Sequence, residues 1–108
     1  MKRHLPLLLF AILLRTASYG QWSSASLQGP RFGMGAATAA GKAIFAGGLG
    51  MISIPPAVSD IYTESTGAWT TGSISTGRNY PAGASTGNWA LFAGGQNDWI
   101  LSVYDKVD

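Results

Sequence analysis

A repeat with a period of 47 residues is the feature that most constrains how this 108-residue chain can fold. Residues 22–48 align with residues 69–95 without a gap and with nine identities in 27 positions. The identities include a tryptophan, an arginine and the run Phe-Ala-Gly-Gly, all in one register. A composition rich in Gly, Ala and Ser gives scattered matches, but it does not readily align these rarer residues. A repeat of roughly 20–50 residues is typical of a chain that stacks copies of one small structural unit.

Each repeat unit is expected to consist of short β-strands. Gly, Ser and Pro residues separate short apolar segments, as they do between the strands of small sheets. We place strands near residues 35–40, 43–47, 60–63 and 68–74. Beyond the first twenty residues, no segment has a sustained helical period. The sequence therefore predicts an all-β fold.

Several repeated residues are expected to build the unit and not to bind a ligand. Glycine pairs at the ends of apolar strands permit positive φ and a close approach of two backbones. Tryptophan side chains offer large flat surfaces for packing between units. The residues to which we assign a structural role are Trp22, Arg31, Gly47, Gly48, Tyr62, Trp69, Arg78, Gly94 and Gly95.

The combined pattern resembles the kelch repeat. A Gly-Gly pair follows an apolar strand, then come Tyr62 and Trp69, at a period close to that of kelch units. Arg31 and Arg78 lie where kelch units often carry an arginine. The resemblance covers residues 22–108 and implies that each unit is a four-stranded antiparallel blade of a β-propeller. The expected fold is therefore about two kelch-type blades, which make an incomplete propeller.

The resemblance also divides the chain. Residues 31–77 are a first kelch-like unit, and residues 78–108 are a second, truncated one. Residues 21–30 are expected to form a lone N-terminal strand, which completes either the last blade of a closed ring or the second unit of this chain. At the other end, Val107-Asp108 aligns with Ser59-Asp60, although Val103–Asp105 can take that place if the loop is shorter.

Two blades cannot close a ring, because propellers have about four to eight. Three interpretations are open on this point. The chain is a fragment of a larger propeller, or copies of it self-associate to complete a ring, or it adopts a different small β fold.

Residues 1–20 are expected to form a secretory signal peptide. A basic head precedes the apolar run 5–14, and the small residues Ser18 and Gly20 precede a cleavage point before Gln21. The run is about half the ~20 residues that a membrane-spanning helix needs, so we expect no stable membrane span. We therefore predict that the protein is secreted, with an uncleaved anchor and a transit peptide as alternatives.

Composition excludes several kinds of chemistry. The chain has no cysteine, and its single histidine, His4, lies in the signal peptide. The mature chain therefore has no Ser-His or Cys-His pair and none of the usual nitrogen or sulfur metal ligands. We predict no catalytic residue, no metal site and no cofactor. Asp60 and Glu64 flank a strand and a turn, which argues against a catalytic pair.

Charge argues against nucleic acid as a partner. Signal cleavage would leave four Lys and Arg residues against five Asp and Glu residues, a net charge of −1. Such a chain has no basic surface for a phosphate backbone.

Recognition is expected in the loops, where propellers carry their binding residues. The candidates are the loop 49–59 and the residues Gln96, Asn97, Asp98 and Trp99. The expected function is that of a secreted, non-enzymatic module that binds a protein or a carbohydrate. One alternative is the N-terminal piece of a secreted oxidase similar to galactose oxidase, whose copper ligands would lie beyond Asp108. Another is a truncated product without function.

Overall fold

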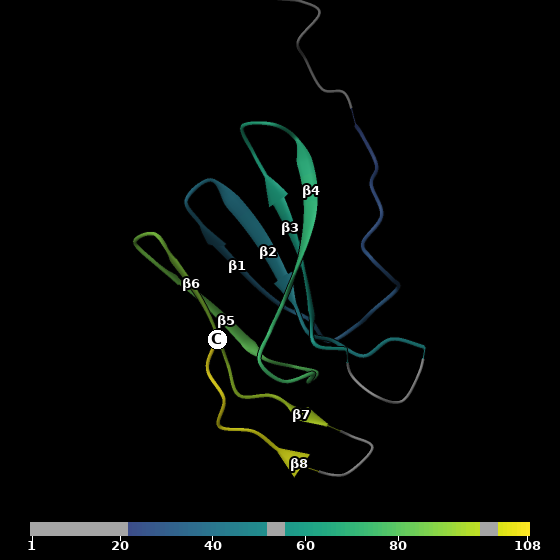
Figure 1. Ribbon diagram of the computed structural model, residues 1–108, viewed down its shortest axis with the longest axis vertical. Coiled ribbons are helices and arrows are strands. Elements are labelled where there is room, and N and C mark those ends of the chain that lie inside the picture. Colours follow the sequence, from purple (N-terminus) through teal and green to yellow (C-terminus); the bar gives the residue numbers. More distant parts are fainter. Residues whose placement is uncertain (1–21, 52–55, 98–101) are drawn as a thin grey trace, which may run out of the picture.

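The computed structural model describes residues 22–51, 56–97 and 102–108 (Figure 1). These residues form eight β-strands and no helix, which confirms the all-β prediction. Within the same residues there is accordingly no helix that could cross a membrane.

Unit 1, residues 31–77, forms a four-stranded antiparallel sheet whose strands lie side by side in the order of the sequence. Its strands are β1 (Gly35–Ala39), β2 (Lys42–Ala46), β3 (Val58–Thr63) and β4 (Ala68–Ser73), which agree with the four predicted segments. Ala40 and Gly41 connect β1 to β2, and both have positive φ, 49° and 71°. Such a two-residue turn matches the twist of the strands it joins.

Unit 2, residues 78–108, repeats the start of this sheet. The hairpin of β5 (Ala82–Thr86) and β6 (Trp89–Ala93) corresponds to β1 and β2, residue for residue. The short strands β7 (Gln96–Asn97) and β8 (Ser102–Val103) follow it and pair with each other.

The last residues of the chain occupy the place of the third strand. Asp108 exchanges two backbone hydrogen bonds of 2.9 Å with Phe92, and Val107 lies opposite Ala93. In unit 1, Asp60 pairs with Phe45 in the same way. The alignment of Val107-Asp108 with Ser59-Asp60 is therefore the one that the structure adopts.

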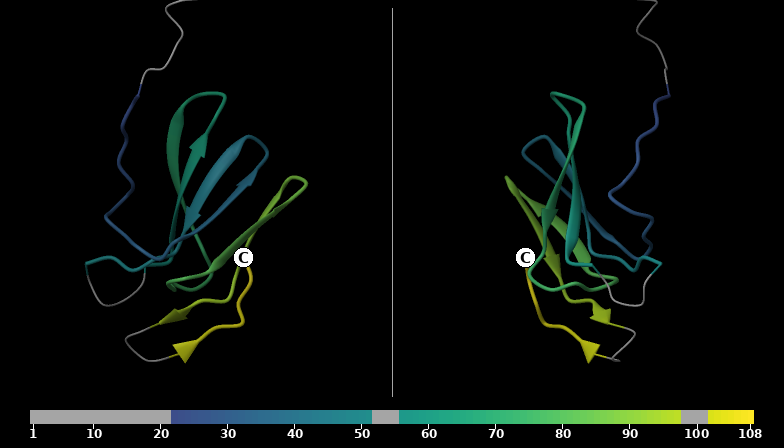
Figure 2. Two further views of the ribbon diagram at one scale, coloured as in Figure 1. Left: turned by 180° about the vertical axis from the view of Figure 1, so that it is seen from behind. Right: turned by 45° about the vertical axis from the view of Figure 1, so that its right-hand side comes forward.

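The two units pack against each other through β1 on one side and the β5–β6 hairpin on the other, which lie side by side in all three views (Figures 1 and 2). The backbone N–H of Thr38 donates to the hydroxyl of Ser85 at 2.8 Å, and these two residues hold equivalent positions in the repeat. A hydrophobic core fills the interface and comprises Ala37, Ala46 and Ile74 of unit 1 and Phe92 of unit 2.

Strand register determines which face of each sheet meets the other unit. Residues opposite each other on neighbouring strands share a face, and successive residues alternate between faces. One face of unit 1 carries Ala37, Ile44 and Ala46 and packs on unit 2. The opposite face carries Phe45 and Trp69, whose rings stack with centroids 6.1 Å apart.

The expected N-terminal strand does not form in residues 22–30, the part of it that the structure describes. The last residues of this segment approach unit 1, where the Gln28 N–H donates to Oδ1 of Asp60 at 3.0 Å. It does not pair with β5 or β6, so it does not complete the second unit within this chain. A strand needs a neighbouring edge to supply its hydrogen bonds, and residues 22–27 have none beside them in the described sheets.

Candidate functional site

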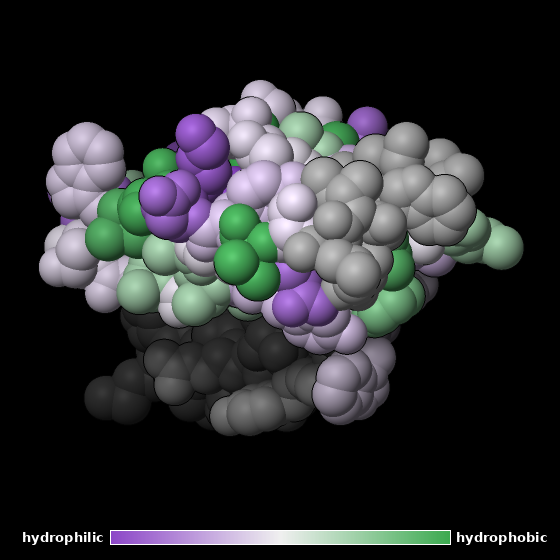
Figure 3. All heavy atoms as spheres, turned by 90° about the horizontal axis from the view of Figure 1, so that it is seen from below, coloured by the Kyte–Doolittle hydropathy of each residue, from purple (hydrophilic) through white to green (hydrophobic). Residues whose placement is uncertain are grey.

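The loop candidates are only partly visible in the structure. Gln96 and Asn97 form β7, are half-buried and pair with Val103 and Ser102. Asp98 and Trp99 lie outside the described residues. Seen from the β7–β8 end, hydrophobic residues on the described surface lie in separate groups among hydrophilic ones (Figure 3).

Of the other predicted loop, 49–59, the first and last residues are described. Leu49 exchanges two backbone hydrogen bonds with Phe32, and Val58 and Ser59 belong to β3. Residues of both predicted loops therefore take part in backbone pairing, namely Leu49, Val58, Ser59, Gln96 and Asn97.

Arg31 holds three segments of unit 1 together. Its Nε donates to the carbonyl of Gly47 at 2.9 Å, and its Nη2 donates to Oδ2 of Asp60 at 2.6 Å. The side chains of Arg31 and Asp60 are 3% and 4% exposed. A buried ion pair of this kind has little access to solvent or ligand.

Arg78 repeats this arrangement in unit 2. Its Nε donates to Gly94 at 2.6 Å, and its Nη2 lies 2.8 Å from Oδ2 of Asp108. The Ser75 N–H donates to Asp108 at 2.7 Å, as the Gln28 N–H does to Asp60. Burial raises the pKa of Asp108, but the hydrogen bonds from Ser75 and Arg78 outweigh it, and the pKa lies below its ordinary value of 3.8.

The first of the two glycine pairs, Gly47-Gly48, lies at the contact between the units. Gly47 and Gly48 have φ values of 69° and 93°, and Gly94 and Gly95 have similar ones. The Gly48 N–H donates to the carbonyl of Arg78 at 2.9 Å, and a Cβ on Gly47 would overlap that same carbonyl. At this contact the backbone geometry therefore requires glycine.

The remaining aromatic candidates lie on different surfaces. Trp69 packs on Tyr62, with ring centroids 5.3 Å apart, as well as on Phe45. Trp22 is fully exposed and lies outside both units.

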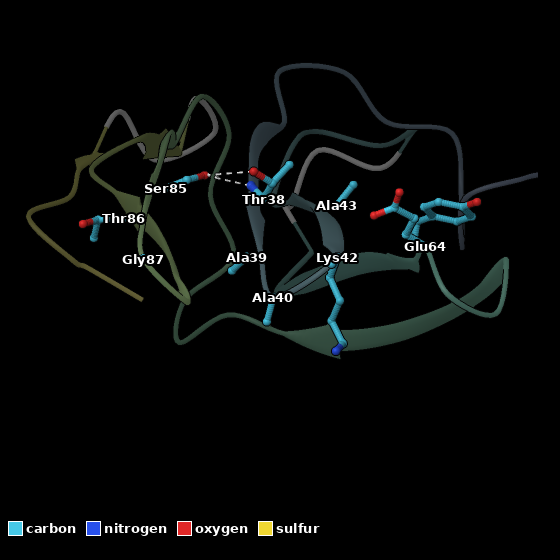
Figure 4. Close-up of a pocket in the computed structure, with 11 residues that line it drawn as sticks. Thr38, Ala39, Ala40, Lys42, Ala43, Glu64, Ser85, Thr86 and Gly87 are labelled. Atoms are coloured by element: carbon cyan, nitrogen blue, oxygen red, sulfur yellow. Dashed lines mark hydrogen bonds between the residues drawn. The ribbon is translucent and has the colours of Figure 1, made fainter.

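A hollow of about 700 Å³ lies where three hairpins end (Figure 4). The turn after β1, the end of β3 and the turn after β5 line it, although they are far apart in sequence. The Glu64 N–H donates to the carbonyl of Gly41 at 2.9 Å and ties two of these turns together. The lining residues are Thr38, Ala39, Ala40, Gly41, Lys42, Ala43, Tyr62, Glu64, Ser85, Thr86 and Gly87.

The hollow combines charged, hydroxyl and aromatic groups. Lys42 supplies an ammonium group, Glu64 a carboxylate, and Tyr62 a ring with a hydroxyl. Thr38 and Ser85 add hydroxyls that lie 3.4 Å apart across the boundary between the units. These groups can donate and accept hydrogen bonds to a polar ligand. Within the described ranges, no three His, Cys, Asp or Glu side chains gather to hold a metal ion.

The hollow was not predicted from the sequence, because each loop was considered by itself as a binding candidate. The available signal was the repeat itself. The turns Ala40-Gly41 and Gly87-Asn88 hold equivalent positions, so stacked units must bring their tips together.

Comparisons with known proteins add no assignment. No protein-family model matches the chain, and no curated protein matches it.

Proposed function

We propose that this chain is a secreted, non-catalytic binding module of the kelch-like β-propeller type, which binds a carbohydrate in the hollow between its hairpin tips. The observation that carries the proposal is the lining of the hollow, which includes two charged side chains, three Ser or Thr hydroxyls and a tyrosine from the two units. The kelch-like assignment rests on the 47-residue repeat, and secretion rests on the composition of residues 1–20.

The chemistry of the hollow suits a sugar. A sugar presents hydroxyl groups that both donate and accept hydrogen bonds, which Lys42 and Glu64 complement. Its C–H faces pack on aromatic rings, and Tyr62 lies in the wall. Most of the residues that line the hollow are exposed, so a sugar can reach them from solvent.

An oligosaccharide array probed with the secreted chain tests the proposal. Lys42→Met and Glu64→Gln each remove one charged group from the lining, and each is expected to weaken glycan binding at least about tenfold, the usual loss when a charged hydrogen bond is removed. Matched controls are Lys106→Met and Asp105→Asn, which change exposed residues outside the hollow and leave binding unchanged.

Two results would overturn the proposal. The first is the absence of any bound glycan at millimolar concentration. The second is glycan binding that neither lining variant changes, because the hollow is then not the site. If a peptide array gives binding that depends on Lys42 and Glu64, the site is correct and the ligand class is a protein.

A further inference from the structure

One face of unit 1 is covered by unit 2, whereas the equivalent face of unit 2 is open. Ala37 is 8% exposed, because unit 2 lies over it, and Ser59, on the same face of unit 1, is 5% exposed. Their equivalents in unit 2 are Ala84, which is exposed, and Val107, which is 63% exposed. This face of unit 2 is thus apolar, like the covered face of unit 1, but it is exposed.

The neighbouring residues extend this unit 2 open face. Leu91, at the place of the half-buried Ile44, is 36% exposed, and Trp89 is 71% exposed. We define the unit 2 open face by Ala84, Trp89, Leu91, Ala93 and Val107. Clustered apolar side chains on a surface mark an interaction site more often than isolated ones do.

Unit 1 also has an open face, which is the equivalent of the face by which unit 2 packs on unit 1. Phe92 of unit 2 is 4% exposed, because it packs on unit 1. Its equivalent, Phe45, lies on the free face of unit 1, where only the ring of Trp69 stacks on it among the described residues. We define the unit 1 open face by Ala36, Phe45 and Trp69.

The two open faces are therefore the two halves of an interface that the chain already makes internally. From this we infer that the unit 2 open face of one copy packs on the unit 1 open face of a second copy, head to tail. The partner is a second copy of this chain, since the contact between units 1 and 2 shows which surface covers each face. Such an interface joins unlike surfaces, so it produces a ring if the rotation closes and an open array if it does not.

Two residue differences make the contact between copies looser than the one within the chain. A Cβ on Gly83 would overlap the backbone carbonyl of Ala36, and one on Gly35 would lie 2.6 Å from that of Pro81. On the open faces, Ala36 replaces Gly83 and Ala82 replaces Gly35. Alanine keeps two backbones farther apart than glycine does, so we expect a weak association that depends on protein concentration.

Sedimentation velocity of the secreted chain over a range of concentrations is the first test. The wild type is expected to shift from monomer to larger species as concentration rises. Trp69→Ala on one face and Leu91→Glu on the other are each expected to weaken association at least about tenfold, because both remove apolar contact at the centre of a face. Trp22→Ala is the matched control, since that tryptophan is fully exposed and outside both units.

A mixing experiment separates head-to-tail packing from other arrangements. Each single-face variant keeps one intact open face, so equal amounts of Trp69→Ala and Leu91→Glu are expected to form a dimer that neither forms alone. An unfolded variant cannot restore association, so this result also controls for misfolding. Ala36→Gly is expected to tighten wild-type association severalfold, because it restores the glycine of the internal contact. A wild type that stays monomeric, or variants that associate alone or fail to complement, would overturn the inference.

Discussion

Removing the negative charge of Asp60 should destabilise the protein more than the same change at Asp108. The perturbations are Asp60→Asn and Asp108→Asn, which keep the shape of each side chain. Both aspartates pair with a buried arginine, so the two variants compare equivalent sites of the repeat.

The magnitude follows from what each arginine retains. Without Asp60, Arg31 keeps one hydrogen bond, to the carbonyl of Gly47, and its guanidinium stays 3% exposed. Breaking a buried pair in this way costs about 3–5 kcal/mol of the free energy of unfolding. Arg78 keeps the carbonyls of Thr76, Phe92 and Gly94. The side chain of Asp108 is also 21% exposed, so we expect a loss of about 1–2 kcal/mol there.

Urea unfolding followed by far-ultraviolet circular dichroism measures both losses. The double variant Arg31→Met/Asp60→Leu is expected to recover most of the stability, because an apolar pair of similar volume often replaces a buried ion pair without loss. Equal losses at Asp60 and Asp108, or a loss at Asp60 below about 1 kcal/mol, would refute this reasoning.

Three further predictions concern packing, pH and backbone strain. Gly83→Ala should cost about 2–3 kcal/mol, because its Cβ overlaps the Ala36 carbonyl, whereas Gly29→Ala has open space and should be neutral in the same urea titration. The stabilisation from Asp108 should be complete above its ordinary pKa of 3.8 and be lost as pH falls through its lower folded-state pKa, a loss that acid titration should not find in Asp108→Asn. Ala40→Gly should raise the melting temperature, because Ala40 has a φ of 49°, and an unchanged or lower value would contradict that.

The strands of unit 1 could be predicted from the sequence, because Gly, Ser and Pro mark their ends. The register of the last residues was one of two alternatives open from the sequence, and it was suggested because Asp108 follows Gly95 much as Asp60 follows Gly48. Both inferences use only local spacing, and the repeat supplies a second copy that checks them.

The contacts between distant segments were not predictable in the same way. Arg31 and Asp60 are 29 residues apart, and only the register of the sheet brings them together. The lone strand at residues 21–30 was predicted from the repeat alone, but a strand also depends on an edge that the described sheets do not place beside residues 22–27. The hollow depends on how the units stack, which no single segment encodes.

The central claim is that the two repeat units stack with equivalent strands side by side. Thr38 and Ser85 test it directly, because their hydroxyl oxygens are 3.4 Å apart and the chain has no cysteine. In Thr38→Cys/Ser85→Cys, mild oxidation should produce an intramolecular disulfide in nearly all monomers. Thr38→Cys/Ser73→Cys, with the second cysteine at the end of β4, should not cross-link. A Thr38→Cys/Ser85→Cys monomer whose thiols remain free would contradict the stacking of the units.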